Sequence, residues 1–178
     1  ALEVYELASN GISTLSSKTP STKMLVLEAV RVLREIDNTL LKIITRMKEL
    51  AKSLPEYEVV RSMGGVGDVL APKLIAEIGD IRRFKNAGSL IAYAGIDSPP
   101  YQSGKYEATN RHISKRGNKY LRKTGFEVMQ SIKSFCRVDC EVYDYIVKKE
   151  TEGKCKKSAK IAGLNKFLRQ YYGILKKK

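Results

Sequence analysis

The stretch RSMGGVGDVLAPKLIAEIG, from Arg61 to Gly79, decides the fold. Its glycines surround a single apolar residue, Val66, and permit a tight turn that residues with a Cβ atom disfavour. Apolar residues recur at helical spacing on both sides of that turn, which predicts helices over 56–63 and 69–78. The stretch therefore predicts two short helices joined by a glycine hairpin.

The predicted hairpin has the features of a helix-hairpin-helix, a module that binds nucleic-acid backbone. We expect Asp68 to cap the second helix and Gly79 to end it. Gly65 and Gly67 keep side chains away from the helix start, where free N–H groups and the helix dipole favour a phosphate, and Lys73 adds a cation. The alternative is a plain helical turn without a ligand.

Composition favours a polyanionic partner. The 178 residues are 43% hydrophobic, enough for one globular domain with an added helical arm, and the net charge is +14. Such an excess of cations is typical of proteins that bind nucleic acid. No apolar run approaches the roughly 18 residues of a membrane span, so a membrane surface is the weaker interpretation and no membrane partner is expected.

The cysteines, Cys136, Cys140 and Cys155, are odd in number and widely spaced, which argues against a disulfide framework and for a reducing cytosol. With a single histidine in the chain, we expect them to be small apolar residues rather than metal ligands. Because the chain begins at Ala1 rather than Met, we expect a fragment of a longer protein or a processed product.

A heptad pattern precedes the hairpin and predicts a coiled-coil helix over 22–55. Ser21 or Thr22 would cap it, Pro55 would end it, and its 30 or so residues would measure about 45 Å. The apolar seam needs a partner helix, in a dimer or between domains; the alternative is a long core helix. The seam residues are Val26, Ala29, Leu33, Ile36, Leu40, Ile43, Met47, Leu50 and Leu54.

The rest of the chain predicts an all-α fold, since no segment alternates apolar and polar residues as a strand does. Asn118 would cap a strong helix that runs to about Val138. The other predicted helices cover 86–94, 142–151 and 159–175. The predicted parts are an N-terminal segment or linker (1–21), the coiled-coil helix (22–55), a helix-hairpin-helix domain (56–136) and basic C-terminal helices (137–178).

A basic run follows a loop rich in Gly, Pro and Tyr. It predicts phosphate contacts with steep salt dependence, and the interleaved tyrosines could stack on unpaired bases. Ser103 lies in the loop, where a hydroxyl could act as a nucleophile if a base and neighbouring cations assist it. No general base is evident from the sequence. The basic residues are Lys105, Arg111, Lys115, Arg116, Lys119, Arg122 and Lys123.

Five ordered blocks of this region resemble the C-terminal domain of the bridge-RNA-guided insertion-sequence transposases of the one-ten group. The resemblance spans about Val59 to Ser134 and does not extend past Cys136; the helix upstream resembles that family's coiled coil. The blocks are 63–67, 76–84, Tyr93-Ala94-Gly95-Ile96 with Pro99, Ser103-Gly104-Lys105, and Ile113 to Arg122. Gly64 stands where the family commonly has Pro, a change that permits the same turn.

The resemblance implies that Ser103 is a recombinase nucleophile that attacks a DNA phosphate and forms a transient phosphoserine link. It implies DNA and a guide RNA as partners, a homo-oligomer formed through 22–55, and a prokaryotic, cytoplasmic, nucleoid-associated enzyme. The family's divalent metal, Mg²⁺, is held by an N-terminal acidic domain that these residues lack. We therefore expect no cofactor or metal site in this chain and no activity from the chain alone.

Two other interpretations stay open from the sequence. The first is a non-catalytic helix-hairpin-helix module that clamps DNA or structured RNA. The second is a coiled-coil scaffold that forms dimers without salt-sensitive nucleic-acid binding.

Overall fold

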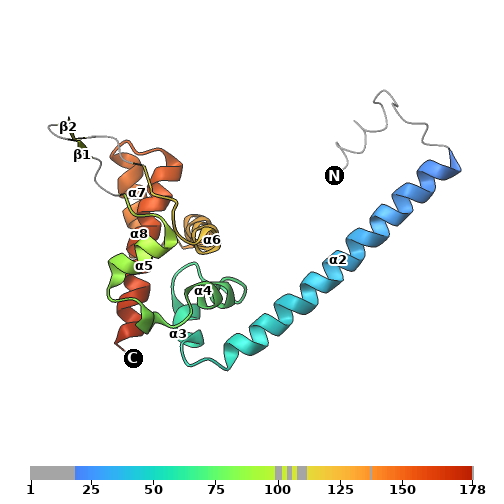
Figure 1. Cartoon of the computed structure of the whole chain (residues 1–178), viewed down its shortest axis with the longest axis horizontal. Coiled ribbons are helices and arrows are strands. Elements are labelled where there is room, and N and C mark those ends of the chain that lie inside the picture. The colour runs from blue at the N-terminus through green and yellow to red at the C-terminus, as the bar shows by residue number, and fades with distance from the viewer. Residues whose placement is uncertain (1–18, 99–101, 104–105, 108–111, 137, 178) are drawn as a thin grey trace. The chain divides into compact units, whose positions relative to one another are not determined.

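A computed structural model describes residues 19–98, 102–103, 106–107, 112–136 and 138–177, with the backbone alone at 102–103 and 106–107. The chain divides into two units, residues 1–45 and 46–178 (Figure 1). No helix among the described residues combines the length and apolar character needed to cross a membrane.

Helix α2 (Pro20–Lys52) is the predicted long helix, and it starts earlier and ends earlier than the sequence indicates. The expected cap at Ser21 or Thr22 is wrong, because Thr19 Oγ1 accepts a hydrogen bond from Thr22 N at 3.4 Å. Proline is favoured at the first helical position, where its missing N–H costs nothing, and this explains the start at Pro20. Over 33 residues the helix measures about 50 Å.

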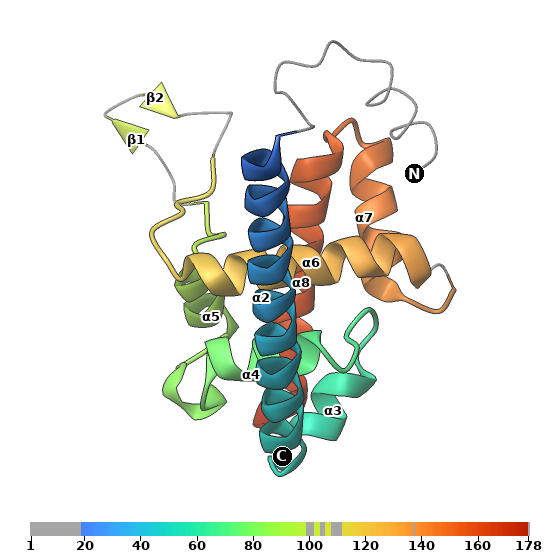
Figure 2. The same ribbon diagram turned by 90° about the vertical axis from the view of Figure 1, so that its right-hand side faces the viewer.

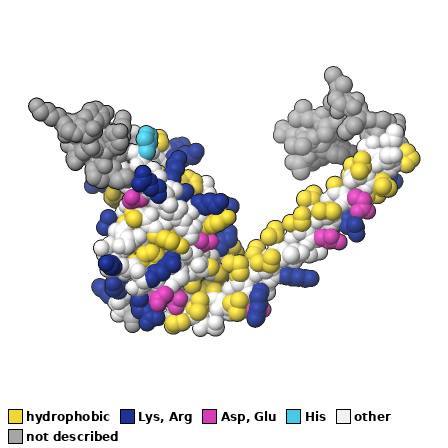
Figure 3. Space-filling view, in the orientation of Figure 1, with side chains coloured by type: hydrophobic (Ala, Val, Ile, Leu, Met, Phe, Trp, Pro, Cys, Tyr) yellow, Lys and Arg dark blue, Asp and Glu magenta, His cyan; other side chains and the backbone are white. Residues whose placement is uncertain are grey.

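The apolar seam of α2 is open to solvent in the single chain. Leu33 is 61% exposed and Leu50 54% exposed, and Figure 3 shows apolar side chains along the helix. Ion pairs form along the helix between residues about one turn apart, such as Arg31 with Glu28 and Arg46 with Glu49. An exposed seam of this length is consistent with a coiled coil, which stays a prediction.

The glycine hairpin joins α3 (Tyr57–Ser62) to α4 (Leu70–Ile78), as the sequence predicts. Gly79 ends α4 with φ +63°, and its N–H bonds Ile75 O at 2.8 Å. The expected capping by Asp68 is wrong: Val69 occupies the cap position without a side-chain bond. Asp68 instead accepts a hydrogen bond from Arg61 Nε, because an opposite charge lies directly across the turn.

The all-α prediction is confirmed. One small exception is an antiparallel pair in which β1 (Gln102–Ser103) faces β2 (Tyr106–Glu107). Asn118 caps α6 as expected, although that helix ends at Phe135 rather than near Val138. The remaining elements are η1 (Ile81–Arg83), α5 (Ala87–Ala94), α6 (Lys119–Phe135), α7 (Glu141–Thr151) and α8 (Lys156–Lys176).

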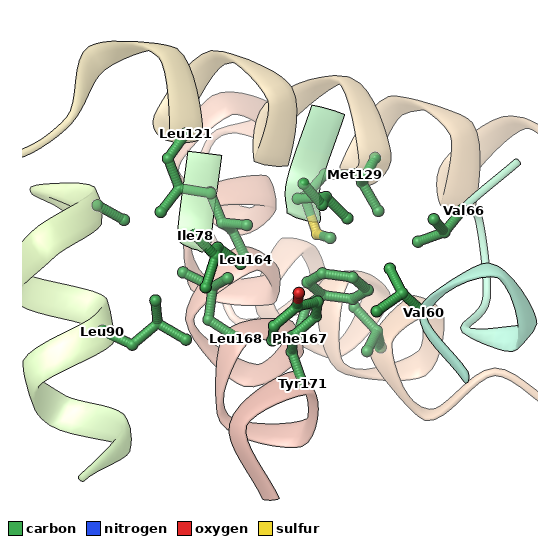
Figure 4. Close-up of a cluster of buried hydrophobic side chains, with 14 of the residues drawn as sticks. Val60, Val66, Ile78, Leu90, Leu121, Met129, Leu164, Phe167, Leu168 and Tyr171 are labelled. Atoms are coloured by element: carbon green, nitrogen blue, oxygen red, sulfur yellow. The ribbon is translucent and has the colours of Figure 1, made fainter. Parts of the chain in front are cut away.

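The core of residues 46–178 forms where α6 crosses α8 (Figure 2). A Cβ atom on Gly125 would lie 2.5 Å from Leu164, so the small residue is what lets the two helices approach. The tail past residue 136 shares this core and is not a separate layer. Figure 4 shows the packed side chains, among them Val60, Ile78, Leu90, Leu121, Met129, Leu164, Phe167 and Leu168.

Candidate functional site

The loop that carries Ser103 is fastened at its base. Ser114 N donates to Asp97 O at 2.8 Å, and Ser114 Oγ donates to a carboxylate oxygen of Asp97. On the outer side of the same junction, Ser98 Oγ donates to His112 O at 3.4 Å. Residues 97–98 and 112–114, which flank the loop, therefore lie side by side.

Ser103 itself lies in β1, where its backbone is paired in register with Tyr106. Lys105 and Arg111, two of the cations expected beside it, lie outside the described residues. The role of Ser103 stays a prediction.

A second set of contacts holds the segment after the loop against the end of α5. Gly95 ends α5 in the left-handed region, with φ +66°, and its carbonyl accepts a bond from Lys115 N at 3.0 Å. Lys115 also has positive φ, which is uncommon for a residue with a side chain. A Cβ atom on Gly117 would collide with Tyr93 O and would lie 2.5 Å from Gly95 N. Only glycine permits this close approach of the two segments.

Asn118 connects three helices. Its Oδ1 accepts from Tyr120 N at 2.8 Å and from Leu121 N at 3.1 Å, which caps α6. Its Nδ2 donates to Glu77 Oε2 on α4 at 2.8 Å and to the Tyr93 hydroxyl on α5 at 3.1 Å. All four hydrogen-bonding positions of one amide are thus used, and they fix the start of α6 relative to α4 and α5.

The Tyr93 hydroxyl lies in a polar environment. The bond from Asn118 and the neighbouring Arg83 guanidinium hold its pKa below the ordinary value, because both stabilise the phenolate form. The Arg83 guanidinium lies 4.5 Å from the Tyr93 ring centroid and 4.7 Å from that of Phe84. The ring is therefore held on its face and at its hydroxyl.

Most of the predicted basic residues that the structure describes are exposed beside this junction. Arg122 is the exception, since its guanidinium donates to Ala94 O at 3.0 Å and so helps to fasten α6 to α5. The ammonium group of Lys119 lies 5.0 Å from the ring centroid of Tyr120, which is 59% exposed. The exposed cations are Lys115, Arg116, Lys119 and Lys123.

The glycine hairpin presents a different surface. Gly65 has φ +75°, and a Cβ atom there would collide with Ile132, so this glycine serves close packing against α6. Gly67 faces open space, but the hollow beside it is lined by Glu58 and by the Arg61–Asp68 pair. Lys73 lies 3.4 Å from Glu127. The hairpin is present, and phosphate binding by Gly65, Gly67 and Lys73 stays a prediction.

Residues 57–143 match the sequence model of the Transposase IS116/IS110/IS902 family. These residues belong to that family. The fastened loop, the Asn118 contacts and the exposed cations all lie inside the matched transposase segment.

Relatives of known name agree with this assignment. The chain is 31% identical over 101 residues to the insertion element IS116 uncharacterized 44.8 kDa protein of Streptomyces clavuligerus. It is 37% identical over 76 residues to the transposase for insertion sequence element IS1111A of Coxiella burnetii. It is 30% identical over 118 residues to the pilin gene-inverting protein of Moraxella bovis. The aligned parts cover 53%, 43% and 66% of this chain, and 25%, 21% and 36% of those proteins.

Sequence reasoning named Asn118 as a helix cap and Gly95 within a family block, but it did not predict the partners of either residue. Glu77 is 41 positions from Asn118, and no local pattern connects an acid on one helix to a cap on another. The hydrogen bond between Ser114 and Asp97 could not be predicted from the sequence either, because the two residues are 17 positions apart.

Proposed function

We propose that this chain is the C-terminal, serine-bearing, nucleic-acid-binding part of an RNA-guided DNA transposase or recombinase. The observation that carries the proposal is the fastened base of the Ser103 loop, set beside exposed cations inside the family segment. The relatives add support, since one is named a transposase and another a gene-inverting protein.

In the proposed reaction, Ser103 Oγ attacks a phosphorus atom of a DNA strand. A new Ser–O–P bond forms as the P–O bond to the leaving strand breaks, and the proton of the Ser103 hydroxyl ends on the leaving oxygen, so that strand departs as a hydroxyl. The hydroxyl of another strand then attacks the phosphoserine and releases Ser103. Because one ester replaces another at each step, strand exchange needs no external energy source.

The exposed cations supply the electrostatic part of the proposal. Lys115, Arg116, Lys119 and Lys123 would bind phosphates on either side of the attacked one. Charge develops on the phosphate in the transition state, and cations already held in place stabilise it without reorganisation. The contact of Asp97 with Ser114 would bring the two ends of the Ser103 loop together beside these cations.

Other components belong to the proposed parent enzyme. We place its divalent metal, Mg²⁺, in an N-terminal acidic domain outside this chain, and no step above passes through a metal. The guide RNA would bind the assembled enzyme. The seam of α2 would join copies of the chain, and the enzyme would act in the prokaryotic cytoplasm at the nucleoid.

The test is the variant Ser103→Ala in the parent enzyme, assayed for strand transfer and for DNA binding. We expect transfer to vanish while affinity for DNA stays within about two-fold, because the change removes one hydroxyl. Ser134→Ala is the matched control, since Ser134 is an exposed serine of α6 that takes no part in the contacts at the base of the loop. We expect this control to keep transfer. Transfer by Ser103→Ala would leave a non-catalytic helix-hairpin-helix binding module as the better account.

A further inference from the structure

An open hollow of about 410 Å³ lies between α6 and α8, on the face of α6 that points away from the core. The α6 residues that line it recur three and four positions apart, so they form one stripe along the helix. Ile161 of α8 closes the opposite side. The volume lies within the range of about 300–1,000 Å³ that is typical of small-ligand sites. The α6 stripe consists of Lys119, Arg122, Lys123, Phe126, Glu127 and Gln130.

The hollow has an aromatic floor and a cationic rim. Phe126 is half-buried, and Lys160 Nζ of α8 lies 5.6 Å from its ring centroid. Lys119 and Lys123 are exposed at the rim. Glu127 is the one carboxylate of the lining, and Lys73 lies 3.4 Å from it. The net charge of the side chains around the hollow is therefore positive.

The close approach of α6 and α8 fixes this arrangement. Gly125 lets Leu164 pack directly against the α6 backbone, and Ile161 and Lys160 lie about one turn earlier on α8. Phe126 follows Gly125 in the chain and so stands at the edge of that contact. The aromatic ring and the α8 lysine are thus presented by rigid helices and not by loops.

One end of the hollow reaches the base of the Ser103 loop. Arg122, part of the lining, donates to Ala94 O at the end of α5, next to Gly95 and the segment that follows the loop. A strand that passes the cations near Lys115 would therefore meet the hollow within the length of α6.

We propose that this hollow holds an unpaired DNA nucleotide, with its base stacked on Phe126 and its phosphates on Lys119, Lys123 and Lys160. The inference rests on the proposed function and deepens it, because strand exchange exposes bases that have lost their partners. Aromatic floors with basic rims are how proteins bind single strands without reading their sequence. We choose DNA over RNA because the strands that the proposed reaction separates and exchanges are DNA.

The experiment measures binding of the whole 178-residue chain to a short single-stranded DNA that contains 2-aminopurine, whose fluorescence falls on stacking. The same sequence as duplex DNA and as single-stranded RNA provides two further arms. The variant is Phe126→Leu, which keeps the apolar volume but removes the stacking surface. We expect it to weaken single-stranded DNA binding about five-fold or more, to lose the quenching, and to change duplex affinity less than two-fold.

Tyr145→Leu is the matched control. Tyr145 of α7 is also half-buried beside two lysines, with Lys149 Nζ at 5.4 Å and Lys166 Nζ at 5.5 Å from its ring centroid, but it lies outside the hollow. We expect this variant to bind like the unaltered chain, and Phe126→Tyr to retain binding and quenching. Circular dichroism checks that each variant is folded.

The possible failures are distinct. If the unaltered chain binds single strands and Phe126→Leu binds them equally well, or weakens duplex binding as much, the stacking site is wrong and the proposed function stands. Tighter, Phe126-dependent binding of RNA than of DNA would overturn DNA as the occupant. If the unaltered chain binds no nucleic acid in any arm, the proposed function itself fails.

Discussion

Asn118→Asp is the sharpest perturbation of the junction that fixes the Ser103 loop. Aspartate caps a helix as well as asparagine does, so the bonds from Tyr120 N and Leu121 N are retained. The Nδ2 donor is replaced by a second carboxylate oxygen, which now faces Glu77 Oε2 at the site of a 2.8 Å hydrogen bond. The change therefore leaves the cap intact and replaces the hydrogen bond between α6 and α4 with repulsion between two carboxylates.

The expected loss of stability follows from those contacts. A hydrogen bond to a charged group contributes about 1.5–3 kcal/mol, and two facing carboxylates add repulsion that the half-exposed site partly screens. We expect the free energy of unfolding to fall by about 2–4 kcal/mol at pH 7, which lowers Tm by roughly 5–15 °C.

The assay is urea and thermal unfolding followed by circular dichroism at low salt. Asn86→Asp is the matched control, because Asn86 caps α5 by accepting from Ser89 N at 2.9 Å and its side-chain bonds stay within that turn. We expect this control to change stability by less than about 0.5 kcal/mol. Adding Glu77→Gln to Asn118→Asp should restore most of the loss, since the amide can donate to the new carboxylate. Equal, small effects at both positions would refute the reasoning.

Two further predictions concern the long helix and the hairpin. Replacing Leu40 and Ile43 of α2 with Asp should convert an oligomer of the chain to a monomer, because both seam residues are about half exposed in the single chain and would be buried in a coiled coil. Light scattering measures the mass in solution, and an unchanged mass would count against the coiled coil. Asp68→Asn should lower Tm at pH 7, because it removes the ion pair with Arg61. The hydrogen bond from Arg61 holds the pKa of Asp68 below 3.8. The difference in Tm between the variant and the unaltered chain should therefore close as the pH falls below 3.8, because the ion pair is lost as the carboxyl protonates. A difference in Tm that does not narrow as the pH falls below 3.8 would contradict the ion pair.

Local signals predicted the helices well. Gly79, Asn86 and Asn118 each act within one turn of their own helix, so their neighbours in the chain predict where α4 ends and where α5 and α6 begin. Asp68 shows the limit of such reasoning, because Arg61 is seven residues away and competes for the carboxylate that would otherwise cap α4.

The candidate site was less predictable. The basic run was evident, but whether a cation is exposed or engaged depends on distant partners: Arg122 is bound to Ala94 O and Lys73 is paired with Glu127. The spacing of Lys119, Lys123 and Phe126 could have indicated one face of α6. Nothing in the sequence indicates that Lys160 of α8 lies beside that face, because only the helix crossing brings it there.

The central claim is that Ser103 forms a covalent link to DNA, and the most direct measurement is to trap that link. The parent enzyme would be incubated with labelled DNA, denatured during strand exchange, digested with protease and analysed by mass spectrometry. The account predicts a DNA-linked peptide with the phosphodiester on Ser103, which disappears in Ser103→Ala. Strand exchange that proceeds without any protein–DNA link, or with the link on another residue, would contradict it.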